Sequence, residues 1–144
     1  NLMKQLKIKK LNKNAVVPEK VYGGDAGMDL YTTGKRATIP PHSVSVISTG
    51  LAVSFPLDFY GEIRERSSIS VKTPLSIKAG IIDNGYRGEI KVVVLNHGKD
   101  EFTVESGTKI AQLIVKKSVD IDVEEVDEFK DRTERSEKGF GSSN

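Results

Sequence analysis

The chain has 144 residues, of which 37% are hydrophobic and 29% are charged, and its formal net charge is +2 at pH 7. This size suits one domain with one core, and this composition is that of a soluble globular protein, not of a disordered chain. The basic and acidic residues are mostly interleaved, which gives no general case for binding nucleic acid or a membrane. Because the chain has no cysteine, disulfides, Cys-ligated zinc and a thiol nucleophile are excluded.

The ends of the sequence bear on where the protein works. No apolar run approaches the length of a membrane span, and the start of the chain shows no signal-peptide pattern. We therefore expect an intracellular protein, cytoplasmic or nuclear. The sequence opens Asn1-Leu2-Met3, and we expect Met3 to be the natural start.

Short segments of strand character, separated by turn residues, run through the first half of the chain. Strands are predicted at residues 6–11, 28–32, 44–55 and 60–64, with turns or loops at 23–27, 39–41 and 56–58. The first strand alternates apolar residues with lysine, as a solvated edge strand does, and this favours an edge over a nucleic-acid patch. A dense polar segment, residues 66–70, follows, and a short helix is expected between Ser67 and Leu75.

The segment Ala79–Glu89 carries the strongest turn signal of the chain. Asn84-Gly85 is a preferred pair for a two-residue β-hairpin with a type I′ turn, which requires positive φ at both positions. Asp83 and Tyr86 would then flank the tip of a tight hairpin, where side chains are held more rigidly than in a loose loop. The outgoing run 90–95 contains four consecutive apolar residues, which predicts a strand buried on both faces, in a sandwich or at a subunit interface.

The rest of the chain continues the pattern and then changes in composition. Strands are predicted at residues 102–104, 110–115 and 119–126. Short strands with turn signals at such regular intervals predict an all-β sandwich or barrel. From Asp127 the chain is charged, polar and glycine-rich, which predicts a body over residues 1–126 and a flexible arm over residues 127–144. Phe140, between two glycines of the arm, could close over a flat, anionic ligand.

Several standard chemistries lack their motifs. The sequence has no G-x-x-x-x-G-K-[ST] phosphate loop, and Gly139-Phe140-Gly141 is not followed by the last glycine of G-x-G-x-x-G. His42 and His97 are the only histidines, and each lies beside turn residues. A histidine-rich metal site and a serine–histidine triad are therefore disfavoured.

Five short elements remain that carry chemistry. They are residues 26–30, 66–68, 80–88, 107–114 and 135–143. They supply acids, arginines, hydroxyl and amide donors and aromatic rings, an inventory that suits a phosphorylated, ring-bearing small molecule with a hydrated cation. In this order and spacing they resemble the five motifs of the trimeric dUTP pyrophosphatases (dUTPases), and the resemblance runs from about Leu6 to the last residue.

The resemblance implies a fold, an assembly and a reaction. The fold would be a jelly-roll-like, distorted all-β barrel with a flexible C-terminal tail, assembled as a homotrimer. The reaction would be Mg²⁺-assisted hydrolysis of dUTP to dUMP and pyrophosphate, which limits uracil in DNA and supplies dUMP for dTMP synthesis. In that family each site is shared: motifs one, two and four come from one subunit, motif three from a second and the tail from a third. Neither nucleic acid nor a membrane is an expected partner.

The resemblance also assigns roles to residues of this chain. Asp83 would be the base that deprotonates the water attacking the α-phosphorus, and Tyr86 would pack on the deoxyribose and exclude a 2′-hydroxyl. The remaining binding residues would be Ile81, Ile82 and Lys91 for uracil, Arg66, Ser67, Ser68 and Gln112 for the phosphates, and Arg135, Phe140, Gly141, Ser142 and Ser143 from the tail. Phe140 would stack on uracil. Asp29 would contact Mg²⁺ through water, while the substrate phosphates hold the ion.

The chain departs from the commonest family pattern at three positions. Ser68 stands where glycine is usual, Gly85 where a second acid is common, and Asn144 where a glycine usually follows the tail serines. None of these departures removes a residue with a named catalytic role.

Two other functions stay open at this point. The dCTP deaminases resemble dUTPases in fold and would release ammonia from dCTP, although the segment 83–88 and the tail match dUTPases better. A dUTPase-like binding module, acting as a switch through a nucleotide or a protein partner, would lack activity or not need it. Without the resemblance, Arg66 and Arg135 would be read as ordinary surface charges, Asp29 as a turn cap and Gln112 as a partner of buried backbone.

Overall fold

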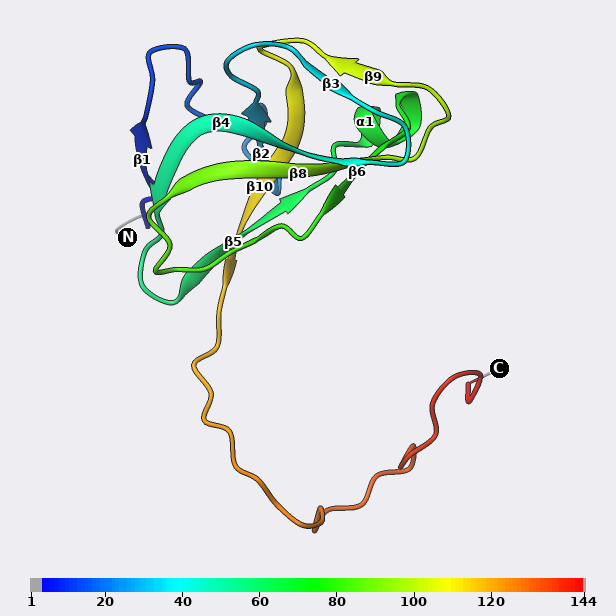
Figure 1. Ribbon diagram of the computed structural model, residues 1–144. Helices are drawn as coiled ribbons and strands as arrows, with labels where there is room; N and C mark the ends of the chain where they lie inside the picture. The colour runs from blue at the N-terminus through cyan, green and yellow to red at the C-terminus, as the bar shows by residue number, and fades with distance from the viewer. Residues whose placement is uncertain (1–3, 144) are drawn as a thin grey trace.

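The computed structural model describes residues 4–143, so the expectations for Met3 and Asn144 lie outside the described residues. Within them the chain forms strands and one short helix (Figure 1). The elements are β1 (Lys7–Lys10), β2 (Gly27–Tyr31), β3 (Ala37–Ile39), β4 (Val44–Ser54), β5 (Phe59–Arg64), α1 (Ser67–Lys72), β6 (Leu75–Lys78), β7 (Ile81–Ile82), β8 (Glu89–Asn96), β9 (Phe102–Val104) and β10 (Lys109–Lys117). The predicted all-β class and the short helix are confirmed. No helix in this part of the chain has the length and apolar character needed to cross a membrane.

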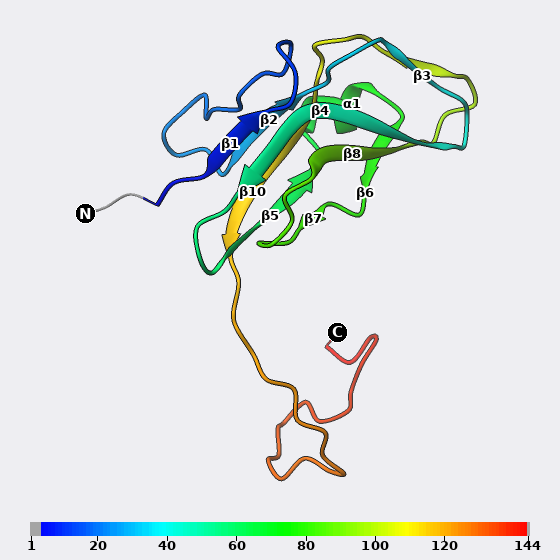
Figure 2. The ribbon, with the colours of Figure 1, turned by 60° about the vertical axis from the view of Figure 1, so that its left-hand side comes forward.

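The strands form two main antiparallel sheets that share one core. One sheet has the order β1-β4-β8-β6, the other has the order β2-β10-β5-β7, and β3 pairs with β9 in a small third sheet. Figure 2 shows β4 and β8 lying over β10 and β5. Buried side chains from both main sheets, among them Leu51, Val92, Leu30 and Leu113, form a single hydrophobic cluster. This is the jelly-roll-like arrangement that the resemblance implied, with β1 at the edge as its lysines predicted.

Strand β8 is buried on one face in the single chain, so it is not buried on both faces within one sandwich, and the predicted alternative, burial at a subunit interface, stays a prediction. Val92 and Val94 are fully buried, whereas the alternate residues Val93 and Leu95 are only partly covered. The sheet order explains this result, because both edges of β8 are paired but only one face meets the second sheet. On the outer face, Val93 and Leu95 lie opposite the exposed β4 residues Val46 and Val44, and we call these four residues the outer apolar patch.

The turn at Asn84-Gly85 is not a type I′ hairpin, which corrects the sequence prediction. Neither residue has positive φ, and a simple turn is closed by a 3.1 Å hydrogen bond from Tyr86 N to Asp83 O. The Asn84 side chain donates to the carbonyls of Pro56 and Phe59. Primed turns match the twist of two strands that pair with each other. Here β7 pairs with β5 while β8 pairs with β4 and β6, so this loop joins two different sheets.

The predicted strand at residues 119–126 is also absent. The last strand ends at Lys117, and residues 118–143 form neither helix nor strand. β10 pairs with β2 as far as Ile114 and with β5 as far as Lys117, and the alternating segment after it pairs with no strand. Its apolar residues Val119, Ile121 and Val123 are 80%, 78% and 95% exposed. Figure 1 shows this part of the chain leaving the body after β10.

Candidate active site

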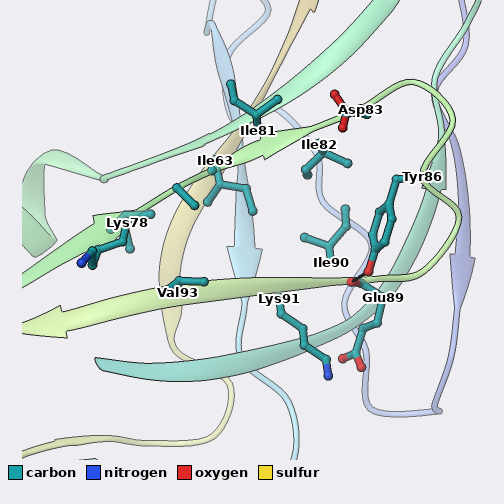
Figure 3. A pocket seen from close by; sticks show the side chains of 13 residues that line it. Ile63, Lys78, Ile81, Ile82, Asp83, Tyr86, Glu89, Ile90, Lys91 and Val93 are labelled. Atoms are coloured by element: carbon teal, nitrogen blue, oxygen red, sulfur yellow. Dashed lines mark hydrogen bonds between the residues drawn. The ribbon is translucent and has the colours of Figure 1, made fainter. Parts of the chain in front are cut away.

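An apolar cleft of about 280 Å³ lies where β6, the β7 loop and β8 meet (Figure 3). Its lining residues are Ile63, Ile77, Lys78, Ala79, Gly80, Ile81, Ile82, Asp83, Tyr86, Glu89, Ile90, Lys91 and Val93. The cleft thus brings together five residues to which the resemblance assigned roles: Asp83 as the catalytic base, Tyr86 for the deoxyribose, and Ile81, Ile82 and Lys91 for uracil. We call this hollow the apolar cleft.

Backbone conformation at the entry to β7 shapes one wall of the apolar cleft. Ile63 N donates a 2.7 Å hydrogen bond to Gly80 O, which ties β5 to the segment before β7. Gly80 has φ +109°, and a Cβ built there would lie 2.6 Å from the carbonyl oxygen of Ile63. Only glycine accepts both the conformation and the close approach. Gly80, the first glycine of the third motif, is therefore required by the backbone conformation and by its close packing against β5.

Tyr86 is fixed as another wall of the apolar cleft. Its hydroxyl donates a 2.7 Å hydrogen bond to Glu89 O, and Figure 3 shows the ring beside Ile90. A Cβ at Gly88 would lie 2.5 Å from that hydroxyl, so glycine is needed for the ring to occupy this position. Tyr86 remains 46% exposed, which leaves part of its side chain available to a ligand.

Asp83 stands at the rim of the apolar cleft, directly after β7. Its main-chain oxygen closes the turn, and its side chain is exposed. Within residues 4–143 no hydrogen bond or ion pair engages its carboxylate. An unengaged carboxylate at the mouth of a cleft is free to accept a proton from a bound water.

A second hollow of about 320 Å³ surrounds Arg66, and we call it the Arg66 cleft. Its lining residues are Glu19, Val21, Tyr22, Asp25, Ala26, Gly27, Asp29, Arg66, Ser67 and Gln112. Arg66 Nε lies 2.8 Å from Asp29 Oδ1 in a largely buried ion pair. Arg66 Nη1 donates to Ser68 Oγ at 3.1 Å, so the hydroxyl at this unusual position helps to hold the guanidinium.

Gln112 is fixed from both sides in the Arg66 cleft. Its Nε2 donates a 2.8 Å hydrogen bond to Glu65 O, and its strand position is directly opposite Asp29. A Cβ at Gly27 would collide with Gln112 Oε1, which explains the glycine of the first motif by close packing. The first, second and fourth motifs therefore meet in one place.

Two residues of this region were missed by the sequence reasoning. Lys109 Nζ lies 3.6 Å from Asp29 Oδ2, on the carboxylate oxygen that Arg66 Nε does not use. Glu65 Oε1 accepts a 3.1 Å hydrogen bond from Ile77 N, which ties β6 to the segment leading into Arg66. Lys109 lies inside the fourth motif, but its alternation with apolar residues also fits an ordinary exposed strand position. No pattern in the sequence pointed to Glu65.

The two clefts are separate, and the tail joins neither of them. They share no lining residue. Phe140 is fully exposed, and Arg135 Nε donates to Lys138 O within the tail itself. None of Arg135, Phe140, Gly141, Ser142 and Ser143 lines either cleft. A single chain thus brings the assigned residues together in two groups and leaves the tail residues apart from both.

The donor groups bear on the expected magnesium ion. Residues 4–143 contain no cluster of three or more His, Asp or Glu side chains that could hold a metal alone. Asp29 offers one carboxylate in the Arg66 cleft, and its Oδ2 is engaged by the ammonium of Lys109 at 3.6 Å. This donor set fits an ion that keeps its waters and is held mainly by ligand phosphates.

The fold and the two clefts define a jelly-roll-like β protein with two hollows on separate parts of the chain. The sequence model of the dUTPase family matches residues 13–144. The chain belongs to the dUTPase family.

Individual relatives agree with this assignment. The deoxyuridine 5′-triphosphate nucleotidohydrolase of Clostridioides difficile is 45% identical over 143 residues, which cover 98% of this chain and 99% of that protein. The dUTPase of Staphylococcus bacteriophage 80alpha with dUpNHpp superposes with a TM-score of 0.91 at 32% identity, covering 97% of this chain and 98% of that one. A mutant dUTPase of S. aureus phage phi11, with a structural Mg(II) ion, gives a TM-score of 0.82 at 27% identity, covering 88% and 99%.

Proposed function

We propose that this protein is a dUTP diphosphatase that hydrolyses dUTP to dUMP and pyrophosphate. The observation that carries the proposal is the apolar cleft, which combines a fixed Tyr86 ring with an unengaged Asp83 carboxylate at its rim. An apolar hollow with a few polar groups is the usual form of a small-molecule site. The full-length similarity to deoxyuridine 5′-triphosphate nucleotidohydrolases supports the choice of substrate.

In this proposal the base and sugar of dUTP occupy the apolar cleft. The backbone around Ile81, Ile82 and Lys91 pairs with the uracil edge, so cytosine would leave donors and acceptors unpaired. The Tyr86 ring packs on the deoxyribose and leaves no room for a 2′-hydroxyl. The phosphate chain then extends from the cleft past Asp83.

The chemical step is an attack of water on the α-phosphorus. Asp83 accepts one proton from the water, and the water oxygen forms a bond to the α-phosphorus. The bond from that phosphorus to the oxygen bridging to the β-phosphorus breaks, and pyrophosphate leaves with the bridging oxygen. Arg66, Ser67, Ser68 and Gln112 hold the phosphate chain, because charged and hydrogen-bonding donors stabilise its negative charge.

We further propose that three copies of the chain assemble and share their sites. The separation of the two clefts supports this arrangement, since one chain alone would keep Asp83 apart from Arg66. The outer apolar patch on β4 and β8 supports association, because contiguous exposed apolar surface marks an interface. The tail of a third subunit would bring Arg135, Ser142 and Ser143 to the phosphates and Gly141 beside Phe140, whose ring stacks on uracil. The body over residues 1–126 and the arm over residues 127–144 keep these separate roles.

The magnesium ion is proposed to bind the phosphate chain, with Asp29 contacting it through water. When bound, the ion neutralises phosphate charge and thereby assists attack at phosphorus. The Asp29 donor set supports this position, and the structural Mg(II) ion of the phage phi11 relative supports only the choice of metal.

The deciding experiment measures pyrophosphate release from dUTP, dTTP, dCTP and UTP, each with and without Mg²⁺. We expect rapid release from dUTP alone and a strong dependence on Mg²⁺. Release of ammonia from dCTP would identify a deaminase instead. Tight binding of dUTP with no pyrophosphate release would identify a binding module.

A further inference from the structure

A β-bulge re-aims one lysine of β10 toward the Arg66 cleft. In the pairing of β10 with β2, Lys109 lies opposite Tyr31, Ala111 opposite Leu30 and Gln112 opposite Asp29, so β10 carries one extra residue. Side chains alternate along a strand, so residues three apart normally point to opposite faces. The extra residue cancels this alternation and turns Lys109 to the face that carries Gln112.

The contacts of Lys109 agree with this direction. Its ammonium lies 3.6 Å from Asp29 Oδ2 and 5.8 Å from the centre of the Tyr31 ring. Its carbonyl oxygen accepts from Arg66 Nη1 at 3.4 Å. The Lys109 side chain is 44% exposed, whereas that of Arg66 is 26% exposed, so the lysine has more freedom to meet a ligand.

The charges of the Arg66 cleft favour a protein cation in addition to the proposed magnesium ion. Its lining includes three carboxylates, Glu19, Asp25 and Asp29, but one cation, Arg66. Arg66 is already paired with Asp29 through Nε. A chain of phosphates entering this cleft would meet a net negative lining. Lys109 lies in the adjoining hollow, which shares Glu19 and Asp29 with the Arg66 cleft.

We propose that Lys109 is a further substrate-binding residue whose ammonium contacts the phosphate chain directly. The proposal rests on the function given above, which places the phosphates of dUTP in the Arg66 cleft. On ligand binding, the ammonium keeps its position over the Tyr31 ring and donates to a phosphate oxygen as well as to Asp29. An ammonium has three donors, so both contacts can form together.

The test measures binding of the non-hydrolysable analogue dUpNHpp by calorimetry. Lys109→Met keeps the length of the side chain but removes its charge, and we expect affinity to fall about tenfold or more, as for loss of a hydrogen bond to a charged group. Lys117→Met, at the exposed end of the same strand, is the matched control and should bind like the wild type. Lys109→Arg should retain most of the affinity. Deoxyuridine, which has no phosphate, should bind both methionine variants equally.

Two further arms keep the proposal open to refutation. In an Asp29→Asn background, Lys109→Met should still weaken dUpNHpp binding, and no further loss would mean that Lys109 acts only through Asp29. Unchanged affinity of Lys109→Met in the wild-type background, or an equal loss for deoxyuridine, would also overturn the proposal. If the wild type itself fails to bind dUpNHpp, the proposed function fails, whatever the variants do.

Discussion

Asp83 is the residue on which the proposed reaction depends. Replacing it with asparagine keeps the size of the side chain and the backbone turn but removes the proton acceptor. We expect Asp83→Asn to lower kcat for dUTP at least about 100-fold, the usual lower range for a general base. Its affinity for dUpNHpp and its assembly should be close to those of the wild type. Near-normal turnover would remove Asp83 from the assigned role.

Gly88 offers a test of the Tyr86 wall. Gly88→Ala would place a methyl group 2.5 Å from the tyrosine hydroxyl and force the ring away from the bond to Glu89. We expect the ratio of kcat/KM for dUTP to that for UTP to fall about tenfold. This is the low end of the discrimination that a pocket achieves through one small group of the substrate. Gly85→Ala is the matched control, since a Cβ there meets nothing within 4 Å and φ is not positive. Equal ratios for the two variants would show that the ring position does not set sugar selection.

At the scale of the elements, strand patterns were predictable and strand partners were not. Alternation and turn residues located the strands 6–11, 44–55 and 60–64, because each side-chain pattern is a local property. The turn type at Asn84-Gly85 depends on which strands pair, and here β7 and β8 join different sheets. The alternating segment 119–126 failed for a related reason, since a pattern cannot reveal whether a free edge lies nearby.

The site shows the same division: residues inside the motifs could be predicted, and contacts that depend on strand pairing could not. The motifs predicted that Arg66 and Gln112 act together, and the structure brings them to one cleft. They also contained Lys109 without indicating its direction, which depends on a bulge in the pairing with β2. Glu65 could not be found at all, because its partner Ile77 N is a backbone group that every sequence carries.

A cross-strand ion pair on β5 and β10 makes a prediction about alkaline stability. The close contact of the Lys116 ammonium with the Glu62 carboxylate, together with the charge of that carboxylate, raises the pKa of Lys116 above its ordinary value of 10.5. The Glu62 oxygen is buried, and the ammonium lies 2.6 Å from it. Because the folded pKa is raised, this stabilisation is fully present below the ordinary pKa and is lost as pH rises through the raised value.

Urea unfolding at about pH 8 and about pH 11 tests this pair. The wild type should lose stability between the two conditions, and Lys116→Met, which lacks the titrating group, should lose less. At the lower pH Lys116→Met should be less stable than the wild type, because the buried oxygen is left without its partner. Lys117→Met should follow the wild type at both values. Parallel losses in wild type and Lys116→Met would contradict the linkage.

At the scale of the whole molecule, the tail should serve catalysis and not folding. Residues 119–143 are exposed, and the last main-chain bond to the body runs from Ser118 N to Asp58 O. Deleting residues 139–144 should therefore sharply lower kcat/KM while leaving the melting temperature and the assembled mass unchanged. Phe140→Ala should reproduce part of the loss, whereas Phe129→Ala, an equally open aromatic of the tail, should not. A truncated protein that unfolds or dissociates would refute this division.

The separation of the two clefts has a genetic consequence. In the proposed trimer each site takes its catalytic base, Asp83, from one subunit and its Arg66 from another. Asp83→Asn and Arg66→Ala then each inactivate every site of a trimer made of one variant only. The two defects nevertheless complement each other. Refolding the two inactive proteins together in equal amounts would restore about one site in four by random assortment of subunits. Activity that appears only after mixing would report the architecture of the site directly. Two mutant alleles in one cell could then support growth that neither supports alone.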